Sequence, residues 1–319
     1  MILTTLVIPG LTVQPCLNVD SREEFGVGES KTKDADSQTL RALVRSSKVL
    51  HEEKLWLNCP ELPMKASTVL FRTTGIYDLV ICDIDGCLSP ESHAAINGPA
   101  LSVIAQHNRQ AIQNRDRPVV TLCSGRPIGF VECLCRLTHN TLIPCIGENG
   151  VWIWRPADNS FECEPTITDE HLEVVHEARK LLRTLYHARG VIQQPGKSAS
   201  VALYHPDTDY LRSAFPTIAE EFQKRGWPIR VSMTWLYINC DLQHVNKGTA
   251  IERLLAETGI DPERTAGIGD TMGDRFIADR VSWFGCPANA EAEIKKSAAY
   301  VSPLSEVEGV LDILERLSL

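Results

Sequence analysis

The sequence lacks the features of a membrane protein and of a nucleic-acid binder. No stretch approaches the roughly 18 apolar residues that a membrane-spanning helix needs. Positive charge is also scarce: 32 Lys and Arg stand against 41 Asp and Glu, which gives a net charge of −9. Because nucleic acids and membrane surfaces attract basic faces, we expect neither as a partner. A small anionic substrate is compatible with this charge, since a metal ion and a local pocket can reverse the field at one site.

No cysteine pattern indicates disulfides or zinc. The 11 cysteines are odd in number, and several lie inside apolar runs, as Cys82 and Cys123 do. Buried thiols behave as small hydrophobic side chains, so we expect a reducing, cytoplasmic environment. Cys133 and Cys135 have no second pair at the spacing of zinc ligands. The apolar segment 1–16 has no Lys or Arg ahead of it, so it is a poor fit to a secretory signal.

The composition changes along the 319 residues, which are enough for two domains. Residues 1–75 are predicted to be an amino-terminal extension with a polar tract over 20–38, weak order, and one helix over 37–55. Met64 opens the segment that leads into the first predicted strand, so we hypothesise that the natural protein starts there. Mass spectrometry of the native protein tests this, since peptides from before Met64 would contradict it.

From residue 76 onward, strands alternate with helices, which is typical of a doubly wound parallel α/β sheet. Buried apolar runs predict strands over 77–82, 118–123, 142–146, 265–268 and 283–286, and helical spacing predicts helices over 100–114, 128–137, 247–258 and 275–280. The middle of the chain differs, with a hairpin over 151–164, helices over 169–188 and 209–225, and strand patterns over 198–204 and 229–241. We therefore predict a Rossmann-like core over 76–150 and 244–319, with an α+β domain inserted over 151–243.

Two carboxylates follow the first predicted strand, in Asp83-Ile84-Asp85-Gly86. Ligands of open α/β sheets bind outside the carboxyl ends of strands, where these side chains would lie. One carboxylate can attack phosphorus, while the other donates a proton to the leaving oxygen and later activates water. An Asp-rich turn that closes a strand is the alternative.

Two further segments favour phosphate binding. Ser124-Gly125-Arg126 follows the second strand, where a hydroxyl, free N–H groups and a helix dipole favour an anion, although an ordinary serine N-cap is the alternative. Lys247 begins the helix after the insertion. There it can neutralise phosphate charge and keep an aspartate ionised, unless it is simply a surface lysine.

Asp270 and Asp274 lie in a glycine-rich segment, 267–274, directly after another buried strand. Carboxylates on a tight glycine turn suit Mg²⁺, which takes few protein carboxylates and keeps several waters. The alternative is an acidic turn that caps a helix. All four segments follow strands or begin helices of one α/β pattern, so they can meet at one edge of one sheet.

The order of the four segments resembles the motifs of the haloacid dehalogenase superfamily, over about 76–305. The insertion between the second and third segments is similar to the type C2 cap of the Cof-like, or IIB, phosphatases. Glu148-Asn149-Gly150 is similar to the Asn-Gly junction of that group. The resemblance implies a Mg²⁺-dependent phosphomonoester hydrolase that acts on a small metabolite, such as a sugar phosphate, through an aspartyl-phosphate.

The resemblance also implies roles for individual residues. Asp83 would be the nucleophile and Asp85 the acid and base. Phosphate or substrate would be bound by Ser124, Gly125, Arg126, Asn149 and Lys247, and Mg²⁺ by Asp83, the Asp85 main-chain carbonyl, Asp270 and Asp274. Two positions depart from the family: Cys87 replaces the usual Thr or Val, and Gly273 replaces the Asn of many members, which leaves the role of Asp274 more open than that of Asp270.

The cap should select the substrate by closing over the site. Candidate contacts from the cap are Tyr204, Tyr237, Lys197 and His205. Two other functions stay open, a phosphomutase of the same superfamily and a non-catalytic phosphate-binding module. A dinucleotide-binding oxidoreductase is not supported, since no Gly-x-Gly-x-x-Gly follows the first strand. The sequence indicates neither the particular phosphorylated substrate nor the oligomeric state.

Overall fold

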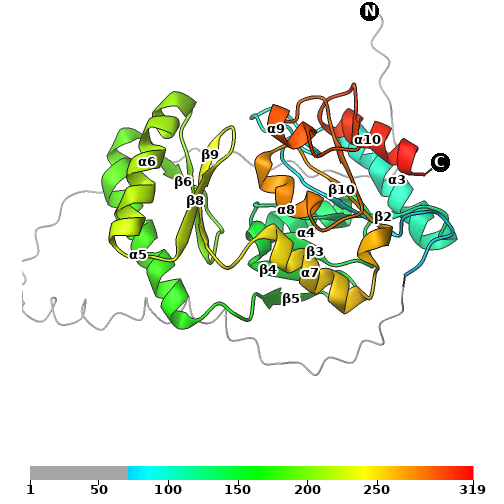
Figure 1. Ribbon diagram of the computed structural model, residues 1–319, viewed down its shortest axis with the longest axis horizontal. Helices are drawn as coiled ribbons and strands as arrows, with labels where there is room; N and C mark the ends of the chain where they lie inside the picture. The colour runs from blue at the N-terminus through cyan, green and yellow to red at the C-terminus, as the bar shows by residue number, and fades with distance from the viewer. Residues whose placement is uncertain (1–70, 319) are drawn as a thin grey trace, which may run out of the picture. The chain divides into compact units, whose positions relative to one another are not determined.

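The computed structural model describes residues 71–318 (Figure 1). The predicted amino-terminal extension up to residue 70, its helix over 37–55 and the hypothetical start at Met64 lie outside the described residues. In the part that is described, no helix combines the length and the apolar character needed to cross a membrane.

A five-stranded parallel sheet lies at the centre of the core, in the order β12-β11-β10-β1-β2. Its strands are β1 (Leu79–Cys82), β2 (Val119–Leu122), β10 (Thr265–Ile268), β11 (Trp283–Cys286) and β12 (Tyr300–Val301). Every residue of β1 is buried, as expected for a strand covered on both faces. Because side chains alternate between the two faces, Val80 and Cys82 pack in one hydrophobic core and Leu79 and Ile81 in the other.

Helices cover both faces of this sheet (Figure 1). One core contains residues of α3 (Gly98–Asn114), α4 (Ile128–Leu137) and α10 (Glu306–Leu317), and the other contains residues of α7 (Lys247–Thr258), α8 (Arg275–Ala278) and α9 (Ala292–Lys295). The Asn97 side chain caps α3 by accepting the Ala100 N–H at 3.1 Å. The predicted doubly wound α/β sheet is confirmed. No element was predicted after residue 286, where the structure adds β12, α9 and α10.

The hairpin predicted over 151–164 is present but packs with the core. It consists of β4 (Trp152–Arg155) and β5 (Ser160–Cys163), and β4 pairs antiparallel with β3 (Cys145–Gly147). Ile153 and Trp154 are buried in the two cores of the main sheet. Only the short turn Glu148–Gly150 separates β3 from β4, so the chain folds straight back onto β3. The predicted cap boundary at residue 151 therefore includes a segment that extends the core.

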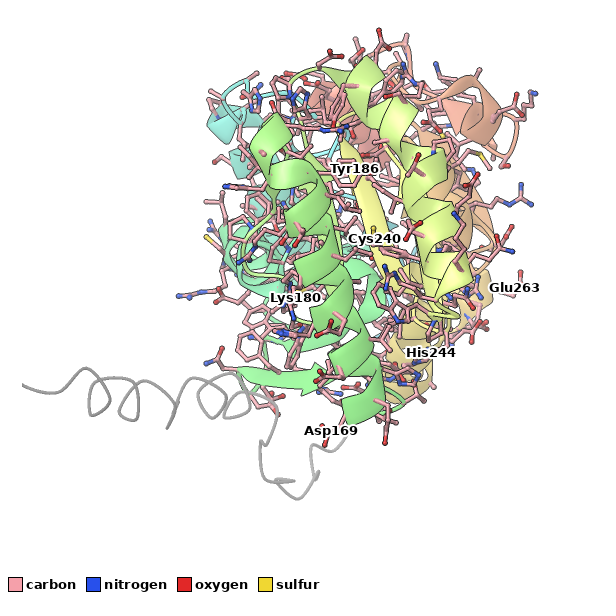
Figure 2. The ribbon with its side chains drawn as sticks, turned by 90° about the vertical axis from the view of Figure 1, so that its left-hand side faces the viewer. Asp169, Lys180, Tyr186, Cys240, His244 and Glu263 are labelled. Carbon is pink, nitrogen blue, oxygen red and sulfur yellow. The ribbon has the colours of Figure 1, made fainter. Side chains whose placement is uncertain are left out.

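The cap has a four-stranded antiparallel sheet in the order β6-β7-β9-β8. Its elements are α5 (Asp169–Tyr186), β6 (Ile192–Gln193), β7 (Ser200–Tyr204), α6 (Thr208–Lys224), β8 (Ile229–Met233) and β9 (Tyr237–Leu242). Figure 2 views the two helices from outside, with Cys240 of β9 behind them. Alternation along the strands turns one set, including Leu203, Ile238 and Cys240, under the helices. The other set, including Ser232, Tyr237 and Asn239, lines a cavity shared with the core.

Candidate active site

The predicted site residues meet at the carboxyl edge of the parallel sheet. Asp83 directly follows β1, Ser124 lies just beyond β2, and Asp270 lies just beyond β10. A cavity of about 90 Å³ there is lined by seven of the predicted residues: Asp83, Asp85, Ser124, Gly125, Arg126, Asn149 and Lys247. The topology of the sheet thus brings together segments that are far apart in the sequence.

Asp83 and Lys247 form a buried ion pair. Lys247 Nζ lies 2.9 Å from Asp83 Oδ1 and 2.7 Å from Asp274 Oδ1. Burial alone would lower the pKa of Lys247, but the charges of Asp274 and Asp83 outweigh it and raise this pKa well above its usual value. Burial, followed by the charge of Asp274, raises the pKa of Asp83. Lys247 opposes that shift, so it favours the ionised carboxylate that a nucleophile needs.

Asp270 and Asp274 differ in what their oxygens contact. Asp274 Oδ2 accepts the N–H groups of Asp270 and Thr271, each at 3.0 Å, and its Oδ1 faces Lys247. Both carboxylate oxygens of Asp270 are buried, and over residues 71–318 neither has a hydrogen-bond partner. Burial, with the charges of Asp274 and Asp83, raises the pKa of Asp270. Asp270 therefore has the free oxygens, while Asp274 holds Lys247 and the turn in place.

This arrangement fits a small divalent cation. Oxygen atoms of Asp83, Asp270 and Asp274 all lie within 4.8 Å of one another. Hard carboxylate oxygens are the ligands that Mg²⁺ prefers, and an unpartnered buried carboxylate requires a compensating charge. Gly86 is also necessary here: its φ is +72°, and a Cβ at this position would lie 2.0 Å from Asp270 Oδ2.

Arg126 contacts the predicted acid and base. Its Nε lies 2.8 Å from Asp85 Oδ2 and its Nη2 lies 2.6 Å from Asp85 Oδ1. The guanidinium carbon also lies 5.3 Å from the centre of the Phe130 ring and 5.7 Å from that of Tyr237, which belongs to the cap. In this structure Arg126 holds Asp85 and links it to the cap, so the predicted substrate-binding guanidinium is engaged by a neighbouring carboxylate.

Ser124 and Gly125 form a turn that leaves one hydroxyl proton available. Ser124 Oγ accepts the Arg126 N–H at 3.1 Å, so its own proton can go to a phosphoryl oxygen. The serine does not cap α4, whose N-cap residue is Pro127. A Cβ at Gly125 would lie 3.0 Å from Asn149 Oδ1, which means that a larger residue would push Asn149 away. Asn149 Nδ2 donates to Asp241 Oδ2 of the cap at 3.1 Å.

Glu148, which the sequence marked only as part of the junction before the cap, ties the core to the cap. Its buried carboxylate accepts the N–H and hydroxyl of Ser198, the N–H of Ala199 and the hydroxyl of Ser200, at 2.8–3.0 Å. Glu148 and Asn149 have φ values of +51° and +55°, which are strained for residues other than glycine. The turn therefore fixes both Asn149 and the loop that carries Lys197.

The four cap candidates have different surroundings. Lys197 and Tyr237 line the cavity, whereas the Tyr204 hydroxyl lies 2.5 Å from His93 Nε2. The His205 Nδ1 accepts the N–H of Asp207 within a turn, and its ring packs on Tyr210, so this histidine is part of a turn. Sequence reasoning missed several cavity residues for which no motif gave a signal: Glu91, Gln194, Ser232, Thr234 and Asn239.

Comparisons with known proteins agree with this fold. The family model of the haloacid dehalogenase-like hydrolases matches residues 189–314. A phosphoglycolate phosphatase of Methanoculleus marisnigri is 26% identical over 240 residues, which cover 74% of this chain and 95% of the relative. A HAD/COF-like hydrolase of Plasmodium vivax has a TM-score of 0.60 at 16% identity, over 76% of this chain and 96% of its own. The sucrose-phosphatase of Synechocystis has a TM-score of 0.52 at 16% identity, over 75% and 97%.

A parallel α/β core with a capped site at its carboxyl edge is the architecture of the haloacid dehalogenase superfamily, and the chain is similar to that superfamily over the residues that the family model matches and to its phosphoglycolate phosphatases over most of the chain. The chain is a phosphatase.

Proposed function

We propose that the chain hydrolyses a small phosphomonoester, such as a sugar phosphate, with Mg²⁺ and through an aspartyl-phosphate on Asp83. The observation that carries this proposal is the pair of unpartnered Asp270 oxygens beside the buried Asp83–Lys247 ion pair. A binding module would need the lysine, but it would have no use for a free carboxylate next to a potential nucleophile. The matched phosphoglycolate phosphatase makes phosphoglycolate one substrate to test.

In the proposed first step, an Asp83 oxygen forms a bond to phosphorus while the bond from phosphorus to the leaving oxygen breaks. Asp85 gives its proton to that leaving oxygen. Ser124 and Lys247 bind the phosphoryl oxygens, and Mg²⁺, held by Asp83, Asp270 and the Asp85 main-chain carbonyl with support from Asp274, would offset their charge. In the second step, Asp85 takes a proton from water, whose oxygen bonds to phosphorus and releases Asp83.

Arg126 has to change its contacts during this cycle. It occupies both oxygens of Asp85, and at least one of them must be released before Asp85 can transfer a proton to a leaving oxygen. We propose that the substrate takes over part of the Arg126 guanidinium when it binds. Arg126 and Asn149, which also lines the cavity, would then contact the substrate as the cap closes.

The test is phosphate release from a panel of metabolite phosphates, with Mg²⁺ and with EDTA, for the wild type and Asp83→Asn. We expect release that requires Mg²⁺ and falls by at least about a thousandfold in the variant, since the covalent step is lost. Turnover that survives Asp83→Asn would refute the role of Asp83. If no panel member is hydrolysed, isomerisation of a sugar phosphate that depends on a bisphosphate activator would favour a phosphomutase.

We also propose a cytoplasmic location. The nine cysteines between residues 71 and 318 are free thiols, which suits a reducing compartment. The expected partner is a small phosphorylated metabolite, with no nucleic acid and no membrane.

A further inference from the structure

One more carboxyl group of the core lines the catalytic cavity. Glu91 lies in the loop between β1 and α3 and shares the cavity with Asp85, Lys197 and Thr234. Its Oε2 is buried, and no described residue gives it a hydrogen bond. Burial and, after it, the charge of Asp85 raise the pKa of Glu91 to about 8, against the Thr234 hydroxyl, which lowers it. A buried acceptor without a partner is a position that a ligand can satisfy.

The loop that carries Glu91 is held against the cap. His93 Nε2 lies 2.5 Å from the Tyr204 hydroxyl, and the two rings meet edge to face with their centres 5.4 Å apart. The Tyr204 ring in turn packs on Tyr237 at 5.6 Å. These contacts hold the loop between Asp85 and the cap sheet, so the position of Glu91 in the cavity is fixed.

In the proposed mechanism, Ser124 and Lys247 bind the phosphoryl group and Asp85 protonates the leaving oxygen. Glu91 shares the cavity with Asp85 and with Thr234 of the cap, so it can reach the leaving group of a bound substrate. Apart from Lys197, the cap residues that line the cavity are neutral hydrogen-bonding groups: Gln194, Ser232, Thr234, Tyr237 and Asn239. Such groups suit the hydroxyls of a substrate.

Resting on the proposed function, we propose that Glu91 determines specificity by accepting a hydrogen bond from a hydroxyl group of the leaving alcohol. The preferred substrates are then phosphate monoesters of polyhydroxylated alcohols. Phosphate esters whose leaving group offers no further hydroxyl, such as phosphoglycolate, are disfavoured, although related phosphatases bear that substrate in their names. Sites that pair a buried polar group with a substrate hydroxyl discriminate strongly against analogues that lack it.

The experiment compares kcat/KM for glycerol 3-phosphate and phosphoglycolate, which are similarly small but carry hydroxyls or a carboxylate. Acetyl phosphate, whose leaving group has no hydroxyl, reports on phosphoryl transfer alone. Glu91→Ala removes the acceptor, and Glu91→Gln keeps an acceptor oxygen. Glu263→Gln is the matched control, since Glu263 is exposed and lies at the opposite edge of the sheet.

We expect the wild type to prefer glycerol 3-phosphate. Glu91→Ala should lower its kcat/KM by about tenfold or more, and Glu91→Gln, which keeps an acceptor oxygen, should lower it less. Acetyl phosphate turnover and the Glu263→Gln control should stay within about twofold of wild type. A wild type that prefers phosphoglycolate would overturn the role of Glu91 alone. So would a Glu91→Ala variant that keeps the wild-type ratio of kcat/KM for glycerol 3-phosphate to kcat/KM for phosphoglycolate while it still hydrolyses acetyl phosphate. If the wild type does not hydrolyse even acetyl phosphate, the proposed function fails and this inference fails with it.

Discussion

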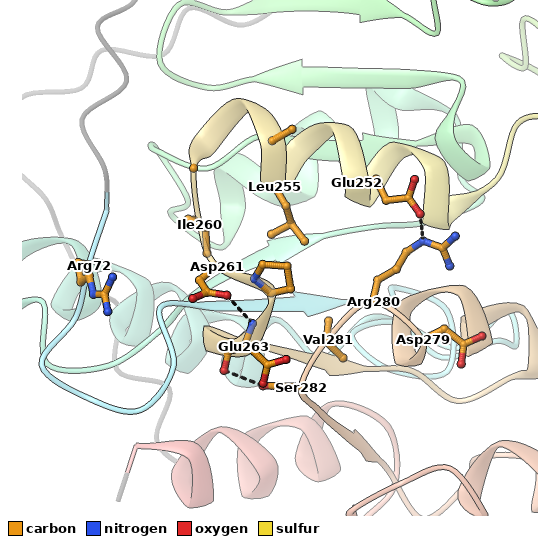
Figure 3. A pocket seen from close by; sticks show the side chains of 13 residues that line it. Arg72, Glu252, Leu255, Ile260, Asp261, Glu263, Asp279, Arg280, Val281 and Ser282 are labelled. Atoms are coloured by element: carbon orange, nitrogen blue, oxygen red, sulfur yellow. Dashed lines mark hydrogen bonds and ion pairs between the residues drawn. The ribbon is translucent and has the colours of Figure 1, made fainter.

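The core sheet has a hollow at the amino ends of its strands and another at their carboxyl ends, and the larger one is not the candidate active site. At the amino edge, a cavity of about 810 Å³ is lined by residues that precede β10 and β11 (Figure 3). At the carboxyl edge, the cavity of the candidate active site is about 90 Å³. Arg280 Nε at the amino edge lies 2.8 Å from Glu252 Oε1, and Asp261 accepts the N–H of Glu263 at 2.9 Å. The charges there are paired locally or face solvent.

The difference between the two edges lies in their buried polar atoms. Asp270 and Glu91 at the carboxyl edge have buried oxygens without hydrogen-bond partners, and no residue of the amino-edge cavity has such an atom within the described range 71–318. Burying a charged oxygen without a partner is unfavourable by roughly several kcal/mol. A ligand that pairs with this oxygen recovers that free energy when it binds. Buried oxygens without hydrogen-bond partners, rather than the volume of the cavity, distinguish the candidate site.

The largest expected difference between the two edges is the effect of breaking an ion pair, that of Lys247 at the carboxyl edge or that of Arg280 at the amino edge. Lys247→Met leaves Asp83 and Asp274 buried without their cation, so we expect turnover to fall by at least about a thousandfold. The free energy of unfolding should fall by about 3–5 kcal/mol, as for other broken buried pairs. Arg280→Met breaks a pair that is partly exposed and should cost at most about 1 kcal/mol. Urea denaturation and phosphate release measure both.

Similar losses of stability in the two variants would contradict this contrast. Lys247→Arg tests whether the positive charge alone is enough, because it keeps the cation but not the compact ammonium group. Compared with Lys247→Met, it should restore more of the free energy of unfolding than of the turnover.

The second contrast concerns cation binding. Asp270→Asn should remove the rise in Tm that Mg²⁺ causes, because it removes the free carboxylate. The metal-free variant should be more stable than the metal-free wild type at neutral pH, since Asn does not have to take up a proton or bury a charge when the chain folds. Asp261→Asn at the amino edge should change neither value. Thermal unfolding with Mg²⁺ and with EDTA tests all three proteins.

The pH dependence of that effect has a definite sign. The folded-state pKa of Asp270 is raised, so ionisation opposes folding and the metal-free stability falls as pH rises above the ordinary carboxyl value of about 4. The gain in Tm from Mg²⁺ should therefore be greater at pH 8 than at pH 5 in the wild type. A gain that is equal at both pH values would show that Asp270 is not the group that Mg²⁺ neutralises.

A third prediction concerns the junction between core and cap. Glu148→Gln replaces a carboxylate that accepts several hydrogen bonds by an amide with one acceptor oxygen, so we expect a loss of about 2 kcal/mol in the free energy of unfolding. Amide hydrogen exchange should increase over 197–200. Glu263→Gln should change neither measurement. Unchanged exchange in Glu148→Gln would mean that the carboxylate does not hold this loop.

The core half of the site could be predicted from the sequence, whereas the cap half could not. Asp83, Ser124 and Asp270 each follow a buried apolar strand, and parallel strands end at the same edge, so their convergence follows from the pattern. The cap strands carry no comparable rule. Which of their alternating residues face the site depends on how the cap packs against the core, and Glu91 lies in a loop without any motif.

The fold shows the same division. Helices with regular apolar spacing were predicted to within a few residues, and α4, with bounds Ile128–Leu137, was predicted as it is observed. The hairpin β4–β5 was predicted as a hairpin but assigned to the cap, because alternation along a strand does not say which neighbour it pairs with. The same limit applies to Asp274, which the sequence suggested as a metal ligand with a role more open than that of Asp270. Only the hydrogen bonds to its oxygens separate the two.

The smallest expected effect is that of Lys197, a cation that the cap contributes to the cavity. Lys197 lines the cavity and forms no ion pair with any residue that the structure describes, so its charge is available to a phosphate dianion. Lys197→Met should raise KM by about threefold to tenfold at low salt, with kcat nearly unchanged and the effect smaller at high ionic strength. Lys180→Met is the control, because this lysine lies on the exposed face of α5, away from the cavity (Figure 2). If both lysine variants raise KM equally, the cap contributes only its general charge. Lys197 then has no more effect on substrate binding than a lysine on the outer surface of the cap.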